Sequence, residues 1–321
     1  MPISAYPANI IIFIHYLCAM DKFYGEICQF LHDYGLHIYK VGEGYGHISV
    51  KAECSGNDRA IPLMLLGTPA TSQEEAERQH AEASAEIARL TDESGTYPLI
   101  LTEDRWSSQG EMTRSRLLAH LEIFTQIYAR NCEVRRIDKA TAQNFLQTNH
   151  SYGDAACKYR YGLYLKRHTG HNALRLSESN DNPDGQAIAA LQPGTLIAVA
   201  TFSNARKWIK GDKTIRSYEW TRYASLPGVR LSGGMGKVLK TFIKEVQPDD
   251  IMTYADLEWS EGKVYEQLGF TLEGVKEPVT FLIGSDCRRR PDRPDIPAME
   301  EDRWLRNFGS NKYRLKLTDY Q

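Results

Sequence analysis

The stretch Arg230-Leu231-Ser232-Gly233-Gly234-Met235-Gly236-Lys237 places three glycines in four positions. A strand is predicted before it, over 216–224, and an amphipathic helix after it, over 235–246. Glycine permits positive φ and a close approach of the backbone to a ligand. The free N–H groups at the start of a helix attract anions such as phosphate, and the helix dipole adds to this attraction. The stretch therefore predicts an anion-binding turn, and a tight turn without a ligand is the alternative.

The composition is that of a globular protein. The chain has 321 residues, enough for two ordinary domains, and 42% of them are hydrophobic and 25% charged. A formal net charge of −2 excludes a general positive field, so nucleic-acid binding would need a local basic patch. The six cysteines form no Cys-x-x-Cys pair, which argues against a zinc site or a disulfide framework. We expect reduced thiols, a cytoplasmic location and no bound metal.

Residues 1–19 are expected to form an N-terminal extension of uncertain structure. Their apolar run over 9–18 is too short to span a bilayer and has no signal-peptide features, so no membrane association is expected. A helix is predicted to begin at Asp21, which suggests Met20 as the natural start. An edge strand or a surface helix is the alternative for the apolar run.

Residues 20–129 predict a smaller N-terminal α/β domain, with the order helix, three strands, helix, strand, helix. This order resembles the core of PD-(D/E)xK nucleases, which need an Asp at the end of one strand and an acid-x-Lys on the next to hold Mg²⁺. The third strand-type run, over 60–66, has neither a carboxylate nor a lysine. The resemblance therefore implies a degenerate, non-cleaving domain. The alternative, which we favour, is a structural domain without a site.

Residues 130–285 predict a second domain, followed by a C-terminal extension over 286–321. The element order of this domain resembles, element by element, the GNAT family of N-acyltransferases. The glycine stretch follows that family's acyl-CoA signature, Arg/Gln-x-x-Gly-x-Gly/Ala, except that Met235 stands where a small residue is usual. The resemblance implies an α/β (α+β) fold with a mixed sheet flanked by helices, and acetyl-CoA or another acyl-CoA as co-substrate. The cofactor-binding residues that it implies are Arg230, Gly233, Gly234, Gly236 and Lys237.

A second landmark is Gly262-Lys263-Val264-Tyr265-Glu266-Gln267-Leu268-Gly269-Phe270. It is similar to the Leu-Tyr-x-x-Leu-Gly-Phe segment that closes many GNAT domains. The resemblance implies that Tyr265 protonates the departing thiolate, because a phenol can donate a proton or a hydrogen bond to sulfur. The alternative is a half-buried tyrosine that packs under the Gly-Phe turn.

Attack by an amine on a thioester also needs a proton acceptor. Glu219, on the strand before the glycine stretch, is the first candidate; Asp256 and His150 are the next. Each carboxylate has the alternative of being solvated or salt-bridged. Arg222 lies three places after Glu219 and points to the opposite face of a regular strand, so pairing the two would require a bulge.

Further stretches, among them 150–153, 218–223 and 308–313, resemble GNAT-like domains of phage and mobile-element proteins, which implies a nucleic-acid substrate. A basic set also surrounds a tryptophan that can stack on a base: Lys207, Trp208, Lys210 and Lys213. A solvated loop is the alternative for this set. The predicted function is acyl transfer from coenzyme A to an unidentified amine. The alternatives are a nucleic-acid-binding or base-modifying protein and a non-catalytic interaction module.

Overall fold

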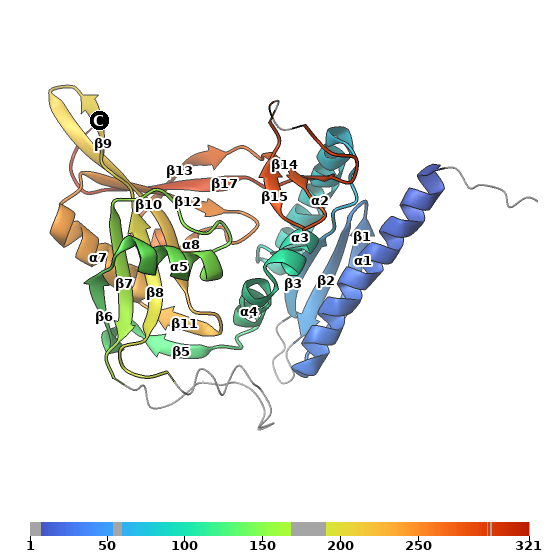
Figure 1. Ribbon diagram of the computed structural model, residues 1–321, viewed down its shortest axis with the longest axis horizontal. Coiled ribbons are helices and arrows are strands. Elements are labelled where there is room, and N and C mark those ends of the chain that lie inside the picture. Colours follow the sequence, from blue (N-terminus) through green and yellow to red (C-terminus); the bar gives the residue numbers. More distant parts are fainter. Residues whose placement is uncertain (1–7, 54–59, 168–190, 294, 296, 321) are drawn as a thin grey trace, which may run out of the picture. The chain divides into compact units, whose positions relative to one another are not determined.

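The computed structural model describes residues 8–53, 60–167, 191–293, 295 and 297–320. The chain divides into two compact units. Unit 1 comprises Met1–Gly110 and Glu277–Gly309, and unit 2 comprises Glu111–Lys276 and Ser310–Gln321. The fold is mixed α/β, with multi-stranded mixed sheets flanked by helices, which confirms the expected fold class (Figure 1).

Unit 1 contains a four-stranded sheet in the order β1-β2-β3-β4. Its strands are β1 (His37–Gly44), β2 (His47–Glu53), β3 (Ala60–Leu66) and β4 (Leu99–Thr102). The first three are antiparallel, and β4 runs parallel to β3 after the crossover helix α2 (Gln73–Ser94). The predicted order agrees with this arrangement up to β4. The single helix expected after β4 is replaced by two, over Glu103–Ser108 and Gly110–His120, and the second lies almost entirely in unit 2.

Helix α1 (Ala8–Asp33) begins before the expected position. It runs without a break through Met20, so residues 8–19 belong to the same helix as the segment predicted to start at Asp21. Phe23, Ile27 and Leu31 recur every fourth residue and are buried, which is the spacing of one helix face. Residues 1–7 of the expected extension lie outside the described residues.

The segment Glu277–Gly309 adds a three-stranded antiparallel sheet to unit 1. Its strands are β14 (Thr280–Ile283), β15 (Arg289–Pro291) and β16 (Arg303–Arg306), with β14 in the centre. Arg289 Nε lies 2.6 Å from Asp104 Oδ2, on helix α3 (Glu103–Ser108), and Arg290 pairs with Asp302. These two arginines are therefore engaged in ion pairs inside unit 1. The sequence-based division had placed β14 in the second domain and β15 and β16 in a C-terminal extension.

Unit 2 is built on a long mixed sheet in the order β13-β17-β12-β10-β8-β7-β6. Its strands are β6 (Cys132–Arg136), β7 (Tyr159–Leu165), β8 (Leu196–Phe202), β10 (Lys213–Ser225), β12 (Asp250–Asp256), β13 (Thr271–Lys276) and β17 (Ser310–Lys316). Neighbours are antiparallel except β10 and β12, which are parallel. The sequence had assigned β17 to a C-terminal extension, whereas it lies inside the sheet between β12 and β13.

Helices cover both faces of this sheet. On α7 (Gly234–Val246), the Phe242 ring stacks on Phe202 with 3.9 Å between centroids. On α5 (Lys139–Asn149), Ala142 and Leu146 pack in a separate cluster with Val199. Because successive residues of a strand point to opposite faces, Val199 faces α5 while its neighbours on β8 join the cluster under α7.

The shorter elements of the chain complete the fold. They are α4 (Gly110–His120), β5 (Thr125–Tyr128), the 3₁₀ helix η1 (Ala129–Asn131), β9 (Arg206–Lys210), β11 (Val229–Ser232) and α8 (Lys263–Gln267). Strand β11 pairs in parallel with β5, and β9 forms a hairpin with β10.

Candidate functional site

The parallel strands β10 and β12 separate part-way along their length. Their pairing covers only Ser217–Glu219 on β10 and Asp250–Met252 on β12, yet both strands continue beyond it. Just past the last pair, the Thr253 hydroxyl donates to the Trp220 carbonyl at 3.1 Å. Backbone groups that leave a ladder must find other partners, and a ligand can supply them. The split therefore lies between the two strands near Glu219 and Thr253.

A bulge on β10 lies at the start of this split. The register of β10 with β8 shifts between Trp220 and Arg222, as it does when a strand contains one extra residue. Burial lowers the pKa of Arg222, and the nearby carboxylates of Glu219 and Asp154 act in the opposite direction. The structure therefore contains the bulge that a pairing of Glu219 with Arg222 requires.

The glycine stretch forms the junction between β11 and α7. Gly233 is the N-cap of α7 with φ of 77°, and Gly234 is its first residue. A Cβ on Gly234 would lie 2.6 Å from Leu231 Cγ and 2.7 Å from the Tyr223 hydroxyl, so no larger residue fits. The first N–H groups of a helix have no acceptor within it, and here they belong to Gly234, Met235 and Gly236. The junction is therefore suited to an anion.

The basic residues of this stretch point elsewhere. Lys237 Nζ donates to the carbonyls of Ala129 and Cys132, which ties α7 to the segment before β6. Arg230 is exposed, with its guanidinium 5.0 Å from the centroid of the Phe124 ring. The structure thus gives Lys237 a local structural contact and leaves the backbone as the main feature of the anion site.

Tyr265, on α8, lies at the same split. Its ring packs against Trp220, Phe270 and Tyr313, with centroids 5.6 to 6.0 Å away. Burial raises the pKa of its hydroxyl, and an interaction with the Thr253 hydroxyl lowers it by less. The phenol is therefore protonated at neutral pH and able to donate, while its ring belongs to the core.

Tyr223 is a site residue that the sequence analysis did not single out. Its hydroxyl lies against Gly234, and burial raises its pKa, with Cys132 and Tyr265 adding to the shift. Two protonated tyrosines therefore lie near the N-terminus of α7. The only sequence signal was an aromatic residue near the end of the strand that precedes the glycine stretch, which is too common to single it out.

His150 and Asp256 are brought together through Tyr152. The Tyr152 hydroxyl donates to Asp256 Oδ2 at 2.9 Å, and His150 Nδ1 accepts from the Tyr152 backbone N–H at 3.1 Å. Asp256 Oδ1 accepts from the Glu258 N–H at 3.0 Å. His150 Nδ1 and Asp256 Oδ2 therefore hold the loop after α5, and Asp256 Oδ1 holds the turn after β12.

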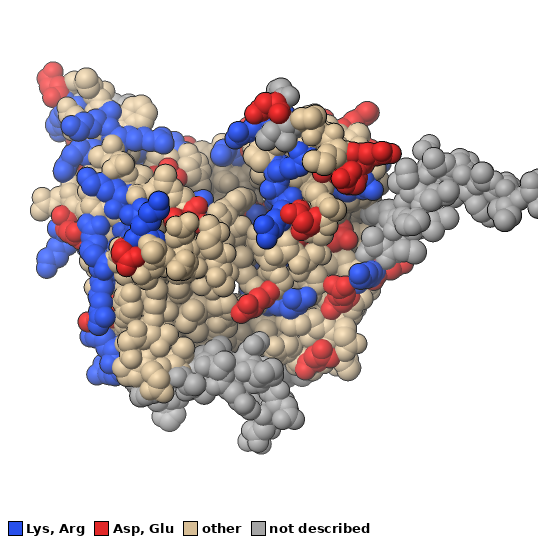
Figure 2. Space-filling view, in the orientation of Figure 1, with Lys and Arg blue, Asp and Glu red and all other residues tan. Residues whose placement is uncertain are grey.

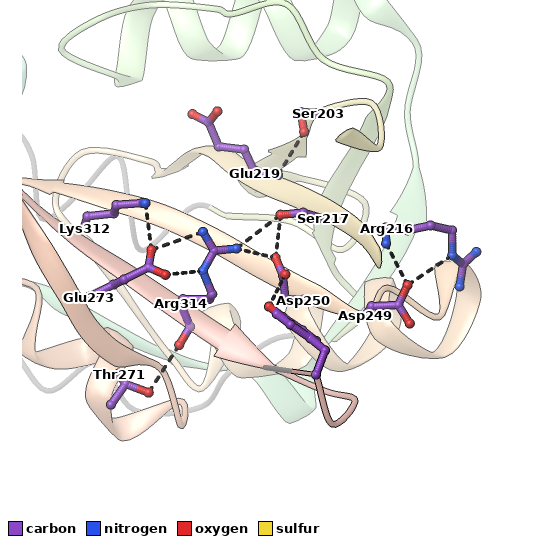
Figure 3. A network of polar contacts seen from close by, with 11 residues as sticks. Ser203, Arg216, Ser217, Glu219, Asp249, Asp250, Thr271, Glu273, Lys312 and Arg314 are labelled. Atoms are coloured by element: carbon purple, nitrogen blue, oxygen red, sulfur yellow. Dashed lines mark hydrogen bonds and ion pairs between the residues drawn. The ribbon is translucent and has the colours of Figure 1, made fainter. Parts of the chain in front are cut away.

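Glu219 differs from these two candidates. Its backbone N–H donates to Ser203 Oγ at 2.9 Å, while its carboxylate points away from the polar network around Arg314 (Figure 3). Among the described residues, no hydrogen bond or ion pair engages that carboxylate, and the side chain is partly exposed. Of the three predicted bases, Glu219 is thus the one best placed to accept a proton.

The described residues contain no group of three or more His, Cys, Asp or Glu side chains arranged to hold a metal ion. In the same part of the chain, no helix is both long enough and apolar enough to cross a membrane.

The sequence matches no protein-family model and no curated protein at a significant level. Among solved structures, it is similar to a GNAT-family acetyltransferase from Bacillus anthracis, with 14% identity, a TM-score of 0.28 and coverage of 58% of this chain and 95% of that chain. It is also similar to a mutant of the AtaT toxin bound to the C-terminus of the antitoxin AtaR and to acetyl-CoA, with 11% identity, a TM-score of 0.25 and coverage of 55% and 93%. At these identities and TM-scores, neither likeness assigns an activity to this chain.

Proposed function

We propose that unit 2 transfers an acyl group from a coenzyme A thioester to an amine. One observation carries the proposal: β10 and β12 separate beside a helix N-terminus whose glycine has no room for a side chain. The bulge on β10 and the hydroxyls of two half-buried tyrosines, Tyr223 and Tyr265, lie at the same place. This combination supplies an anion site, an opening between strands and proton donors.

The residues present fit the two ends of an acyl-CoA. The backbone N–H groups of Gly234, Met235 and Gly236 would hold a pyrophosphate, because the helix dipole and the unpaired donors both favour an anion. The backbone N–H and C=O groups along the separated edge of β10 would form hydrogen bonds with the amide groups of the pantetheine arm. Acyl-CoA supplies an activated carbonyl carbon and a thiolate leaving group.

The chain's own residues have two tasks in the transfer. Glu219 accepts the proton that the amine must lose before or during attack on the carbonyl carbon. As the new C–N bond forms and the C–S bond breaks, Tyr265 donates its proton to the departing sulfur. Burial keeps Tyr265 protonated for this step, and solvent then restores its proton. Tyr223 is a second hydroxyl available near the anion site.

Isothermal titration calorimetry of the purified chain with acetyl-CoA tests the proposal. Gly236 offers a matched pair of variants, because a Cβ there meets only Leu268 Cδ2, at 3.3 Å. Gly236→Asp adds a negative charge in the first turn of α7, where acidic residues favour helix stability. Gly236→Asn adds a side chain of the same shape without the charge.

We expect the wild-type chain to bind and Gly236→Asp to bind at least about tenfold more weakly than Gly236→Asn, since the added carboxylate repels a phosphate. A folded wild-type protein that gives no binding heat would overturn the proposal. Equal affinities for the two variants would show that the phosphate groups of acetyl-CoA do not bind at the N-terminus of α7.

A further inference from the structure

A second feature of unit 2 lies outside the split between β10 and β12. Strand β9 pairs with the first part of β10, with Arg206–Lys210 opposite Lys213–Ser217, and among the described strands it has no other neighbour. Figure 1 shows this β9–β10 hairpin extending beyond the other strands of unit 2. The acyl-transfer proposal assigns it no role.

The hairpin is strongly basic. Between 206 and 216 stand five Lys or Arg residues and one acid, Asp212, in a chain whose net charge is −2. Arg216 is engaged by Asp249, at 3.6 Å. Within the described residues, the exposed side chains of Arg206, Lys207 and Lys213 form no ion pair, and Lys213 Nζ donates only to the Asp319 carbonyl. Lys and Arg gather over this hairpin in Figure 2.

Two large apolar side chains lie among these cations. Trp208 is 52% exposed and Ile209 is 83% exposed. Trp208 lies opposite Ile215 in the register, and Ile215 is buried, so the indole has a packed residue beside it. Because side chains alternate along a strand, Arg206 shares the face of Trp208, and Lys207 shares that of Ile209. Each face of β9 therefore presents an apolar group next to a cation.

We propose that the β9–β10 hairpin binds single-stranded nucleic acid, with a base stacked on Trp208 and phosphates contacted by Arg206, Lys207 and Lys213. Charge complementarity favours a polyanion, and an exposed aromatic ring among cations is how sequence-tolerant single-strand binding proteins hold bases. An anionic membrane fits less well, because the turn presents the carboxylate of Asp212 ahead of the apolar side chains. Because the overall net charge is slightly negative, nucleic-acid binding requires a local basic patch, and this hairpin provides one. The side chain of Lys210, also predicted for this role, lies outside the described part of the chain.

The test is fluorescence anisotropy of labelled 20-nucleotide oligo-dT and oligo-U with the full chain, from 50 to 200 mM salt. We expect Trp208→Ala to weaken binding by about 5- to 150-fold, which corresponds to stacking of one base, and Trp208→Phe to retain most of the affinity. Lys207→Gln/Lys213→Gln should flatten the dependence of log K on log salt by about 1.4, or about 0.7 for each phosphate that the variant no longer neutralises.

The matched control is Lys240→Gln/Lys244→Gln, which removes the same charge from exposed positions of α7. This control should change affinity by less than about twofold. Equal weakening by the two double variants, or full binding by Trp208→Ala, would overturn the proposal. Binding to vesicles with anionic lipid but not to either oligonucleotide would assign the hairpin to a membrane. Titration of the same variants with acetyl-CoA measures acyl-CoA binding independently. A failure of the nucleic-acid proposal can therefore be distinguished from a failure of the acyl-transfer proposal.

Discussion

The two units differ in what engages their most distinctive polar side chains. In unit 1, Asp104 and Arg289 have side chains only 1% and 10% exposed and lie 2.6 Å apart, while the Gln79 amide donates to the carbonyls of Gly46 and Gly67. In unit 2, Glu219 and the Tyr265 hydroxyl lie where two strands separate. Polar groups that are paired inside a unit stabilise it, whereas groups held at an opening are available to a ligand. The difference fits the proposal that acyl transfer takes place in unit 2.

Unit 2 also contains a network of paired polar side chains around Asp250 and Arg314. Asp250 accepts from Ser217 Oγ at 2.5 Å and from Arg314 at 2.7 Å, and Arg314 also bonds Glu273 (Figure 3). Ser217 and Asp250 form the first pair in the short parallel ladder between β10 and β12. The network therefore holds the strands together at one end of that ladder, and the split begins at the other end.

The largest effect is expected from the ion pair in unit 1. Asp104→Asn should destabilise unit 1 by about 3 kcal/mol, because it leaves a buried guanidinium opposite a neutral amide. Burial acts to raise the pKa of Asp104, but its interactions with Arg289, together with those of Arg105 and Thr102, lower that pKa overall, which agrees with a charged pair. Urea unfolding, with hydrogen exchange to locate the transition in β4, measures the change.

The control for this prediction is Asp286→Asn, which alters an exposed pair with Arg288 in the same unit. That change should cost less than about 0.5 kcal/mol. If the two variants are equally stable, the buried pair does not stabilise unit 1, and the contrast between the units fails.

An intermediate effect is expected at the split. Tyr265→Phe should lower kcat about 10²-fold and leave the Kd for acetyl-CoA within about twofold, because it removes a proton donor and keeps the ring packed. Steady-state kinetics and calorimetry measure the two quantities. Tyr161→Phe, which removes a hydroxyl that donates to Glu245, is the control and should leave kcat unchanged. Equal loss of kcat and affinity in Tyr265→Phe would assign the residue to packing alone.

The smallest effect on the free energy of unfolding is expected for Glu273, at the edge of the structural network. Hydrogen bonding to Arg314 lowers the pKa of Glu273 from 4.5 to about 2, against the opposing effect of burial. A lowered folded-state pKa stabilises the protein above pH 4.5, and this contribution is lost as the pH falls towards 2. Since Glu273 is partly exposed, Glu273→Gln should cost only about 0.5 kcal/mol at pH 7.

Urea unfolding of Glu273→Gln and the wild type at pH 7, 4 and 3 measures this contribution. The gap between the two proteins should narrow as the pH falls. Glu277→Gln, at an exposed position of the loop after β13, is the control and should show no gap at any of these pH values. A gap that widens on acidification would contradict the assigned direction of the pKa shift.

Most elements of the site were predictable from local sequence, and the missing ones depended on distant parts of the chain. The glycine stretch, the Glu219 strand and the Tyr265 helix follow from turn chemistry and periodicity within short windows. Tyr223 could not be selected, because only the approach of α7 brings Gly234 against its hydroxyl. The basic run over 206–216 was interpreted as a loop or a binding patch, and the structure shows a paired hairpin.

The sequence by itself predicted the fold class and the position of the glycine turn, because the elements around that turn show in the local pattern of residues. The candidate proton donor was implied by the resemblance to the GNAT family. Only the tertiary structure decided that Val279–Ile283 belongs to unit 1 and that Ser310–Lys316 lies inside the sheet of unit 2. Strand pairing over such separations leaves no local periodicity to read. Likewise, the side chain of Lys237 points to backbone carbonyls because of where the segment before β6 lies. The glycine turn was visible in the sequence, and the opening that it borders is a product of the folded sheet.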